Sequence, residues 1–234
     1  MGERQRERPR PLIPRMLRLG FERREGGSYR ILCLGAHSDD IEIGCGGTIL
    51  ELLRTQPALE FDWVVLSSGA ERDREAKQSA ELFLKGAAKK NIEVANFRTS
   101  FFPFEGLQIK EYLEALKEHG SPDLILTHTR DDLHQDHRVV NELTWNTWRS
   151  HLILEYEIPK YDGDLGRPNF FVPLSRETCD RKIKYLMECF KTQQDKHWFT
   201  EDLFLGLMRL RGMEANSPGK FAEAFYSRKA VFGT

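Results

Sequence analysis

Two short segments of this 234-residue chain combine histidines with carboxylates and could bind a metal ion. They are residues 37–40, HSDD, and residues 134–137, HQDH. His37 and Asp40 stand three residues apart where a strand turns into a helix, so both side chains can face one point, and His137 is a natural third ligand. Two histidines and one carboxylate, with a water at the open position, are a catalytic zinc arrangement. The same ligands suit non-haem Fe²⁺ and other divalent metals, so the spacing predicts the site and leaves the metal open.

The other polar residues of these segments could take part in hydrolysis. A bound metal lowers the pKa of its water towards about 7, which produces a nucleophile at neutral pH. Asp39 is directed away from its neighbour Asp40 by the backbone, so it could accept the proton of that water. His134 lies one helical turn before His137 and could donate to a developing oxyanion. Asp136, or another nearby carboxylate, would then hold His134 as an imidazolium.

Each segment alone has an ordinary structural explanation, because aspartates are common caps where a helix begins. Two such segments at the ends of two strands of one domain favour a metal site instead. His119 and His151 have no partners nearby in the sequence, and we expect them on the surface. His128 ends a predicted strand near the site and could equally be a buried structural histidine.

The elements that must position these residues alternate between strand and helix. Apolar runs predict buried strands over residues 29–36, 61–66, 92–97 and 123–127. Apolar residues at helical spacing predict helices over residues 44–54, 74–84 and 107–118 and another through residues 139–147. The last third differs, with strands expected over 152–158 and 170–172 and helices over 176–191 and 201–210. This alternation predicts an α/β fold with a mostly parallel sheet, helices on both faces and an elaborated C-terminal portion. In such sheets ligands bind at the carboxyl ends of the strands.

The composition excludes several classes of protein. Hydrophobic residues are 40% and charged residues 30%, and the net charge of −1 gives no basic footprint for a nucleic acid. No uncharged apolar run reaches the roughly 18 residues of a membrane span. We expect a cytoplasmic protein without a secretory signal, with its four cysteines reduced. Residues 1–27 are expected to be a flexible arm of mixed charge, and residues 28–234 a single domain.

The two segments resemble the signatures of a known family. Residues 36–47, AHSDDIEIGCGG, resemble the AHPDDxE signature of the PIG-L/LmbE family of zinc-dependent N-acetyl amino-sugar deacetylases, and residues 133–138, LHQDHR, resemble its HPDH signature. Serine and glutamine replace proline at two non-ligand positions. Residues 67–76 resemble the family's loop and RxxEA helix, and residues 221–225, FAEAF, resemble its YAEAF segment. The resemblance covers roughly residues 29–225.

The resemblance implies a Rossmann-like three-layer αβα fold and hydrolysis of an N-acetyl group from an amino-sugar conjugate, with release of acetate. His37, Asp40 and His137 are the implied Zn²⁺ ligands. Asp39 would be the general base, and His134 would stabilise the tetrahedral intermediate.

The resemblance also suggests where substrate binds. Arg72 falls where the family often places a substrate-contacting arginine, although a solvated residue at a helix start is the alternative. The loops and the last third are expected to line the pocket for the aglycone, with the candidates Tyr156, Tyr161, Arg167, Lys196, His197 and Trp198. The expected partner is therefore a small N-acetylated amino-sugar conjugate whose aglycone the sequence does not name. A homo-oligomer is left open.

Three other functions fit parts of the sequence. A hydrolase of another bond, such as a phosphate ester, could use Asp39 and Asp40 on Mg²⁺, but the histidines favour zinc. A catalytically silent binding module on the same fold would not need its catalytic residues. Every predicted catalytic position is filled in this chain, which argues against such a module. A nucleotide-binding transferase would carry GxGxxG after the first strand, where this chain has GCGG after the aspartate pair.

Overall fold

The computed structural model of the chain describes residues 20–21, 27–56 and 58–231. At its centre is a seven-stranded sheet in the order β3-β2-β1-β4-β5-β7-β6. The first five strands pair in parallel, whereas β7 runs antiparallel to β5 and to β6. The strands are β1 (Tyr29–Gly35), β2 (Leu59–Val65), β3 (Lys89–Val94), β4 (Leu124–His128), β5 (Leu152–Tyr156), β6 (Phe170–Leu174) and β7 (Phe221–Tyr226).

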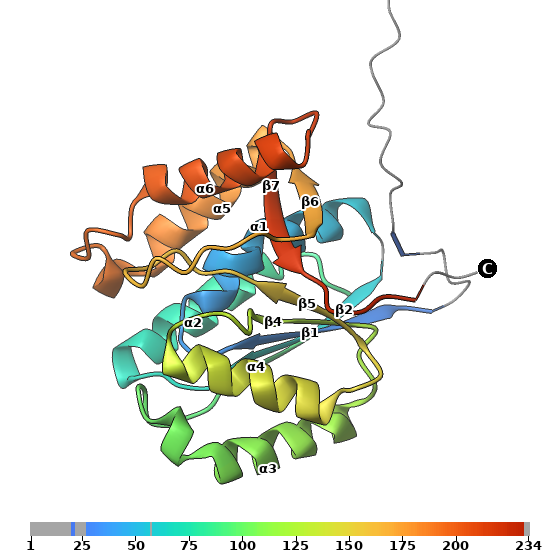
Figure 1. The fold of residues 1–234 in the computed structure, drawn as a ribbon, viewed down its shortest axis with the longest axis vertical. Helices are drawn as coiled ribbons and strands as arrows, with labels where there is room; N and C mark the ends of the chain where they lie inside the picture. The colour runs from blue at the N-terminus through green and yellow to red at the C-terminus, as the bar shows by residue number, and fades with distance from the viewer. Residues whose placement is uncertain (1–19, 22–26, 57, 232–234) are drawn as a thin grey trace, which may run out of the picture.

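Helices cover both faces of the sheet (Figure 1). Helices α3 and α4 lie on one face, and α1, α2, α5 and α6 lie on the other. The predicted three-layer αβα architecture with a mostly parallel sheet is therefore confirmed. The helices are α1 (Asp40–Thr55), α2 (Ala70–Phe83), α3 (Gly106–Leu116), α4 (Gln135–Thr147), α5 (Arg176–Cys189) and α6 (Glu201–Glu214), and short 3₁₀ turns span Phe102–Phe104, Lys117–His119 and Lys191–Gln193.

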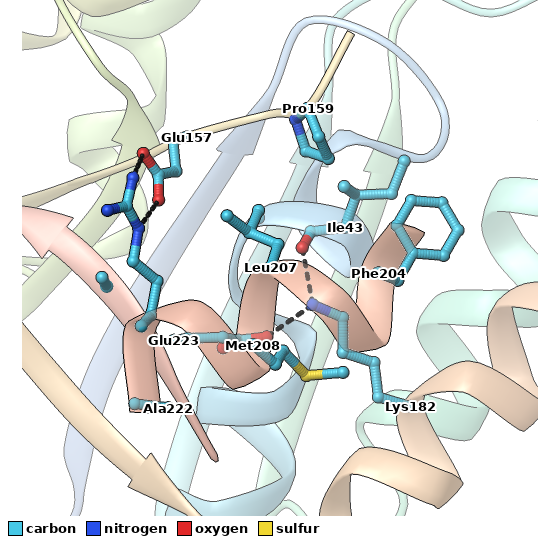
Figure 2. A pocket seen from close by; sticks show the side chains of 12 residues that line it. Ile43, Glu157, Pro159, Lys182, Phe204, Leu207, Met208, Ala222 and Glu223 are labelled. Atoms are coloured by element: carbon cyan, nitrogen blue, oxygen red, sulfur yellow. Dashed lines mark hydrogen bonds and ion pairs between the residues drawn. The ribbon is translucent and has the colours of Figure 1, made fainter. Parts of the chain in front are cut away.

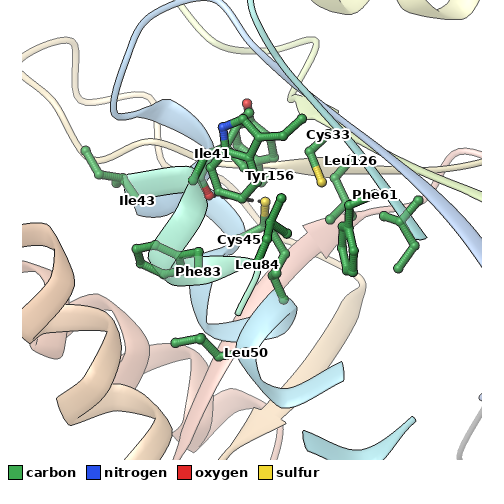
Figure 3. Close-up of a cluster of buried hydrophobic side chains, with 14 of the residues drawn as sticks. Cys33, Ile41, Ile43, Cys45, Leu50, Phe61, Phe83, Leu84, Leu126 and Tyr156 are labelled. Carbon is green, nitrogen blue, oxygen red and sulfur yellow. Dashed lines mark hydrogen bonds between the residues drawn. The ribbon is translucent and has the colours of Figure 1, made fainter. Parts of the chain in front are cut away.

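The central strand β1 shows why the sheet is buried on both sides. Successive side chains of a strand point to opposite faces, so a strand covered on both faces must be apolar throughout. Ile31 and Cys33 join the core under α1 and α2, while Leu32 and Leu34 join the core under α3 and α4. Figure 3 shows the first of these cores, in which Cys33 lies among side chains from several elements.

Helix α1 begins at Asp40, earlier than the predicted start at residue 44. Its glycines occupy places where a side chain would not fit. A Cβ on Gly44 would lie 2.2 Å from the ring of Tyr156, and one on Gly46 would lie 2.5 Å from the ring of Phe83. Glycine weakens an isolated helix, but here it lets α1 approach β5 and α2 closely. The second candidate segment, residues 134–137, also lies at the start of a helix, since α4 begins at Gln135.

The last third completes the sheet in a way that the sequence pattern did not anticipate. The FAEAF segment forms β7, which inserts between β5 and β6. All four cysteines are buried free thiols, as expected. Among the described residues, no helix combines the length and the apolar character needed to cross a membrane. Most of the predicted arm, residues 1–27, lies outside the described residues.

Candidate metal centre

The candidate site lies where the chain reverses its direction of travel across the sheet. From β1 the chain passes outward to β2 and β3, then returns to β4 on the other side of β1. The carboxyl ends of β1 and β4 therefore flank a topological switch point, where ligands bind in open α/β sheets. His37 follows β1, and Asp40 is the first residue of α1. His137 lies in the first turn of α4, so the pairing of β1 with β4 brings the two segments together as predicted.

Three nitrogen and oxygen atoms of the predicted ligands converge on one point. His37 Nδ1 lies 3.1 Å from His137 Nε2 and 3.3 Å from Asp40 Oδ2, and the last two atoms are 3.5 Å apart. Ligand atoms about 2.0–2.1 Å from a tetrahedral zinc ion are separated by about 3.3 Å. All three residues are buried. The residues present therefore fit a zinc-sized ion with one position left open.

The opposite nitrogen of each histidine is held by a carboxylate. His37 Nε2 is 3.0 Å from Asp136 Oδ2, and His137 Nδ1 is 2.9 Å from Asp132 Oδ2. Histidines that bind metals usually donate their second N–H to a carboxylate or carbonyl, which fixes the ring and directs the other lone pair at the metal. This arrangement on both rings is the feature of the centre that most resembles a metal site.

The charges around the centre favour a cation between these side chains. Burial lowers the pKa of His37, but the carboxylates of Asp40 and Asp136 outweigh it and raise that pKa to about 9. Burial and the neighbouring His128 lower the pKa of His137 to about 4. The surroundings of His37 thus favour a positive charge, and His137 keeps a free lone pair. A metal ion bound between them would supply the charge and accept the lone pair.

The carboxylate of Asp136 has a different partner from the one predicted. It accepts hydrogen bonds from the backbone N–H groups of Ser100 (2.6 Å) and Phe102 (3.2 Å) as well as facing His37. From the sequence, this carboxylate or one nearby was expected to hold His134. That expectation is wrong for the carboxylate of Asp136, because the loop after β3 supplies donors that turn it toward His37.

Whereas the sequence predicts an imidazolium, the contacts of His134 favour a neutral ring. Its Nδ1 accepts the backbone N–H of Asp136 at 3.2 Å and caps α4, so in the neutral ring Nε2 carries the proton. Burial and the nearby His37 lower the pKa of His134. Its ring centroid lies 4.9 Å from that of His37 and 4.5 Å from that of His137. The Nε2–H group could therefore donate to a substrate at this centre.

Asp39 and Arg72 form the side of the site next to the ligands. Asp39 is buried, its Oδ1 lies 2.9 Å from Arg72 NH2, and its Oδ2 has no hydrogen-bond partner among the described residues. Burial raises the pKa of Asp39, and the charge of Arg72 opposes that rise. Arg72 comes from the first turn of α2. Its contact with Asp39 lacks hydrogen-bond geometry, and its buried Nε is also unpaired within the described chain.

Two other sets of residues could compete for a metal ion. The ligand atoms of His37, His134 and His137 lie within 4.8 Å of one another, and so do those of Asp40, His128 and His137. His128 is fully buried, and its Nε2 accepts the backbone N–H of Ala36 at 3.0 Å. That bond uses the lone pair closest to Asp40, which favours a structural role for His128.

Sequence reasoning missed Asp132 and misjudged part of the pocket lining. Asp132 stands two residues before His134, in the pattern DxHxDH, and that spacing is the signal that could have revealed it. Among the candidate lining residues, Tyr156 is a core residue whose hydroxyl donates to Leu34 O at 2.6 Å. Tyr161 and His197 contact each other at 5.1 Å between ring centroids. The positive charge of Lys196 is near enough to Asp39 to act to lower its pKa.

The fold and this centre define an α/β protein with a histidine–carboxylate site at the switch point of its sheet. The model of the PIG-L family, described as GlcNAc-PI de-N-acetylase, matches residues 32–148. The chain therefore belongs to the PIG-L family. None of the curated protein sequences compared with the chain matches it.

Several solved structures share the fold. N,N'-diacetylchitobiose deacetylase from Pyrococcus horikoshii is 20% identical with a TM-score of 0.66, over 86% of this chain and 84% of that one. The 4-carboxy-2-hydroxymuconate hydratase from Pseudomonas putida KT2440 is 17% identical with a TM-score of 0.69, over 88% and 98%. A zinc-inhibited form of teicoplanin deacetylase is 13% identical with a TM-score of 0.66, over 85% and 97%. At these identities the likeness shows the fold alone.

Proposed function

We propose that this chain is a metal-dependent hydrolase that removes an N-acetyl group from a small amino-sugar conjugate. The observation that carries the proposal is the convergence of His37, Asp40 and His137, with a carboxylate behind each imidazole. Membership of the PIG-L family, and the deacetylases among the structures of the same fold, support the reaction. Zinc suits this ligand set, and Fe²⁺ or another divalent ion is the alternative.

Bound at these three residues, the metal would supply a Lewis acid that polarises the amide carbonyl and lowers the pKa of a water molecule. Asp39 Oδ2 is buried and unpaired among the described residues, so it is free to take the proton of the attacking water. Arg72 fixes the carboxylate of Asp39 through Oδ1. The same arginine has a buried unpaired Nε with which it could hold a substrate oxygen.

His134 would stabilise the oxyanion that forms when water adds to the amide carbon. Its Nε2–H is the donor, because Nδ1 is occupied by the cap of α4. When the C–N bond breaks, the proton held by Asp39 passes to the departing amine and acetate is released. In this scheme Asp136 and Asp132 orient the ligands and do not touch the substrate.

The test combines metal content with amine release from a panel of N-acetylglucosamine conjugates, alongside a phosphate ester. We expect one zinc per chain and conjugate-dependent amine release. The Asp39→Asn variant should keep zinc and lose amine release, and the His137→Ala variant should lose zinc. Hydrolysis of the phosphate ester without amine release would favour the other class of hydrolase. A full equivalent of zinc on His137→Ala would show that the proposed ligand set is wrong.

A further inference from the structure

Two motifs of the sequence, the GCGG of α1 and the FAEAF of β7, have no part in the proposed chemistry, and the structure brings them together. Glu223 in the middle of β7 is buried and reaches the interior of α1. Its Oε1 accepts the backbone N–H of Gly47 at 2.8 Å, and its Oε2 accepts that of Thr48 at 2.6 Å. A Cβ on Gly47 would lie 2.8 Å from Glu223 Oε1, so glycine makes room for the carboxylate.

A buried lysine completes the arrangement (Figure 2). Lys182 of α5 donates from Nζ to Glu223 Oε1 and to the carbonyl oxygen of Ile43, both at 2.6 Å. In an uninterrupted helix the N–H of Gly47 bonds to that same carbonyl. The ion pair therefore contacts both partners of that expected bond, with its carboxylate at the donor Gly47 and its ammonium at the acceptor Ile43. Side chains that enter the ladder of a helix in this way set its local direction.

The turn that this ion pair holds belongs to the metal centre. Ile43 lies one turn after Asp40, which is the first residue of α1 and a proposed ligand. On another side of the same turn, Gly44 packs against the ring of Tyr156. The start of α1 is thus held by β5, by β7 and by α5, and its position decides where Asp40 meets the two histidines.

We propose that Lys182 and Glu223 are positioning residues, which hold α1 through Ile43, Gly47 and Thr48 so that Asp40, at its start, can share a metal ion with His37 and His137. This inference rests on the proposed function, because it concerns the ligand geometry of that metal. Both residues lie outside residues 32–148, which the family model matches. The last third of the chain therefore contributes to metal affinity without supplying a ligand.

The same pocket contains a matched control. Arg211 of α6 and Glu157, which follows β5, form a second buried ion pair, with Nε to Oε1 at 2.6 Å and NH2 to Oε2 at 2.8 Å (Figure 2). Arg211 also donates to Glu214 and to the carbonyl of Gly166, and none of its hydrogen bonds among the described residues reaches α1. Removing one partner of either pair leaves a buried charge unpaired, but within the described chain only the Lys182–Glu223 pair makes hydrogen bonds to the helix that begins with Asp40.

The experiment measures the zinc dissociation constant, by competition with a chelator, for the variants Glu223→Gln, Lys182→Met and Glu157→Gln. The temperature is chosen so that circular dichroism shows all of them folded. We expect zinc to bind roughly 2- to 30-fold more weakly to Glu223→Gln and Lys182→Met, the usual range for residues that act on a site without contacting it. Zinc binding to Glu157→Gln should match the wild type even though that variant also loses stability. Lys182→Arg keeps the charge and should restore much of the affinity lost in Lys182→Met.

A second measurement does not depend on metal. In the metal-free protein, the amide hydrogens of Gly47 and Thr48 should exchange faster in Glu223→Gln than in the wild type. Their exchange rates in Glu157→Gln should equal those of the wild type. Equal zinc affinities across all variants, or an equal loss in Glu223→Gln and Glu157→Gln, would reduce the pair to an ordinary structural role. A wild-type protein that binds no zinc would overturn the proposed function and this inference with it. A wild-type protein that binds zinc, with variants that bind it equally well, would overturn this inference alone.

Discussion

At the scale of single residues, the carboxylate of Asp132 contacts two histidines of the candidate centre. It is buried, accepts from the ring of His137 at 2.9 Å, and accepts the backbone N–H of His134 at 2.8 Å. Lys160 Nζ lies 3.0 Å from Oδ1, the oxygen that accepts from His134. The Asp132→Asn variant should therefore bind zinc about 10- to 100-fold more weakly, because an amide orients the imidazole less strongly. Asp131→Asn is the control, since that neighbouring side chain is 77% exposed; an equal loss there would argue against the assignment.

His134 separates metal binding from catalysis. Because Nδ1 of His134 is engaged with the backbone of Asp136, only Nε2–H can act on a substrate. The His134→Ala variant should keep its zinc and lose roughly 100- to 1000-fold in turnover, the usual effect of removing one oxyanion donor. Metal analysis and amine release on the same preparation test this. Loss of zinc in the variant would point instead to the set His37, His134 and His137.

The proposed ligands could be picked out from the sequence, whereas the carboxylates behind them could not. His37, Asp40 and His137 are fixed by local spacing at two strand ends, and adjacent parallel strands bring such ends together. The direction of Asp136 depends instead on two N–H groups from the loop after β3, about 35 residues away. No local pattern shows which loop reaches a helix start, so the sequence leaves the partner of Asp136 open, and the structure places its carboxylate against His37.

At the scale of elements, the glycines of α1 allow this helix to pack closely against β5 and α2. A Cβ on Gly44 would fall inside the ring of Tyr156, so Gly44→Ala should lower the free energy of unfolding by about 1–3 kcal/mol. At Gly206 in α6 a Cβ would meet no neighbouring atom within 4 Å, so Gly206→Ala should raise that free energy by about 0.5–1 kcal/mol. Urea unfolding of the two variants measures both. If Gly44→Ala stabilised the protein as Gly206→Ala does, the packing of α1 against β5 would be in doubt.

The same elements show what sequence periodicity can and cannot predict. The parallel strands and most helices follow from apolar spacing, because burial on both faces requires apolar runs. Helix α1 begins four residues before the predicted start, and these added residues include Ile41 and Ile43, which are buried in the core. Its glycines are set by close packing, which helix propensity does not include. Strand β7 was unanticipated, since FAEAF carries a buried glutamate whose place in the core depends on Lys182 and the α1 backbone.

At the scale of the whole molecule, the chain builds one site from all of its parts. The switch point of the sheet supplies the ligands, the loop after β3 orients His37 through Asp136, and the last third holds α1 through Glu223. Metal affinity should therefore respond to substitutions spread over the whole sequence, as the variants above are designed to test. A site confined to its two signatures would respond only to residues 37–40 and 134–137.

The buried thiols make the free energy of unfolding depend on pH in the alkaline range. Burial raises the pKa of Cys189 to about 11 and that of Cys179 to about 12, and it raises those of Cys33 and Cys45 well above the ordinary value of 9.0. Well below their ordinary pKa, at about pH 7, the thiols are protonated whether the chain is folded or not, so they have little effect on the pH dependence of stability there. As the pH rises from 9 toward 11, the unfolded chain releases protons that the folded chain retains, and the free energy of unfolding must fall.

Urea unfolding between pH 7 and 10.5 should show this fall, and replacing Cys179 and Cys189 together by alanine should make the slope shallower. A thiol reagent at pH 8 should find none of the four cysteines in the native protein and all of them in urea, because each is buried. Rapid labelling of the native protein, or a stability that stays constant up to pH 10.5, would contradict the closed core on which the positions of α1 and α5 depend.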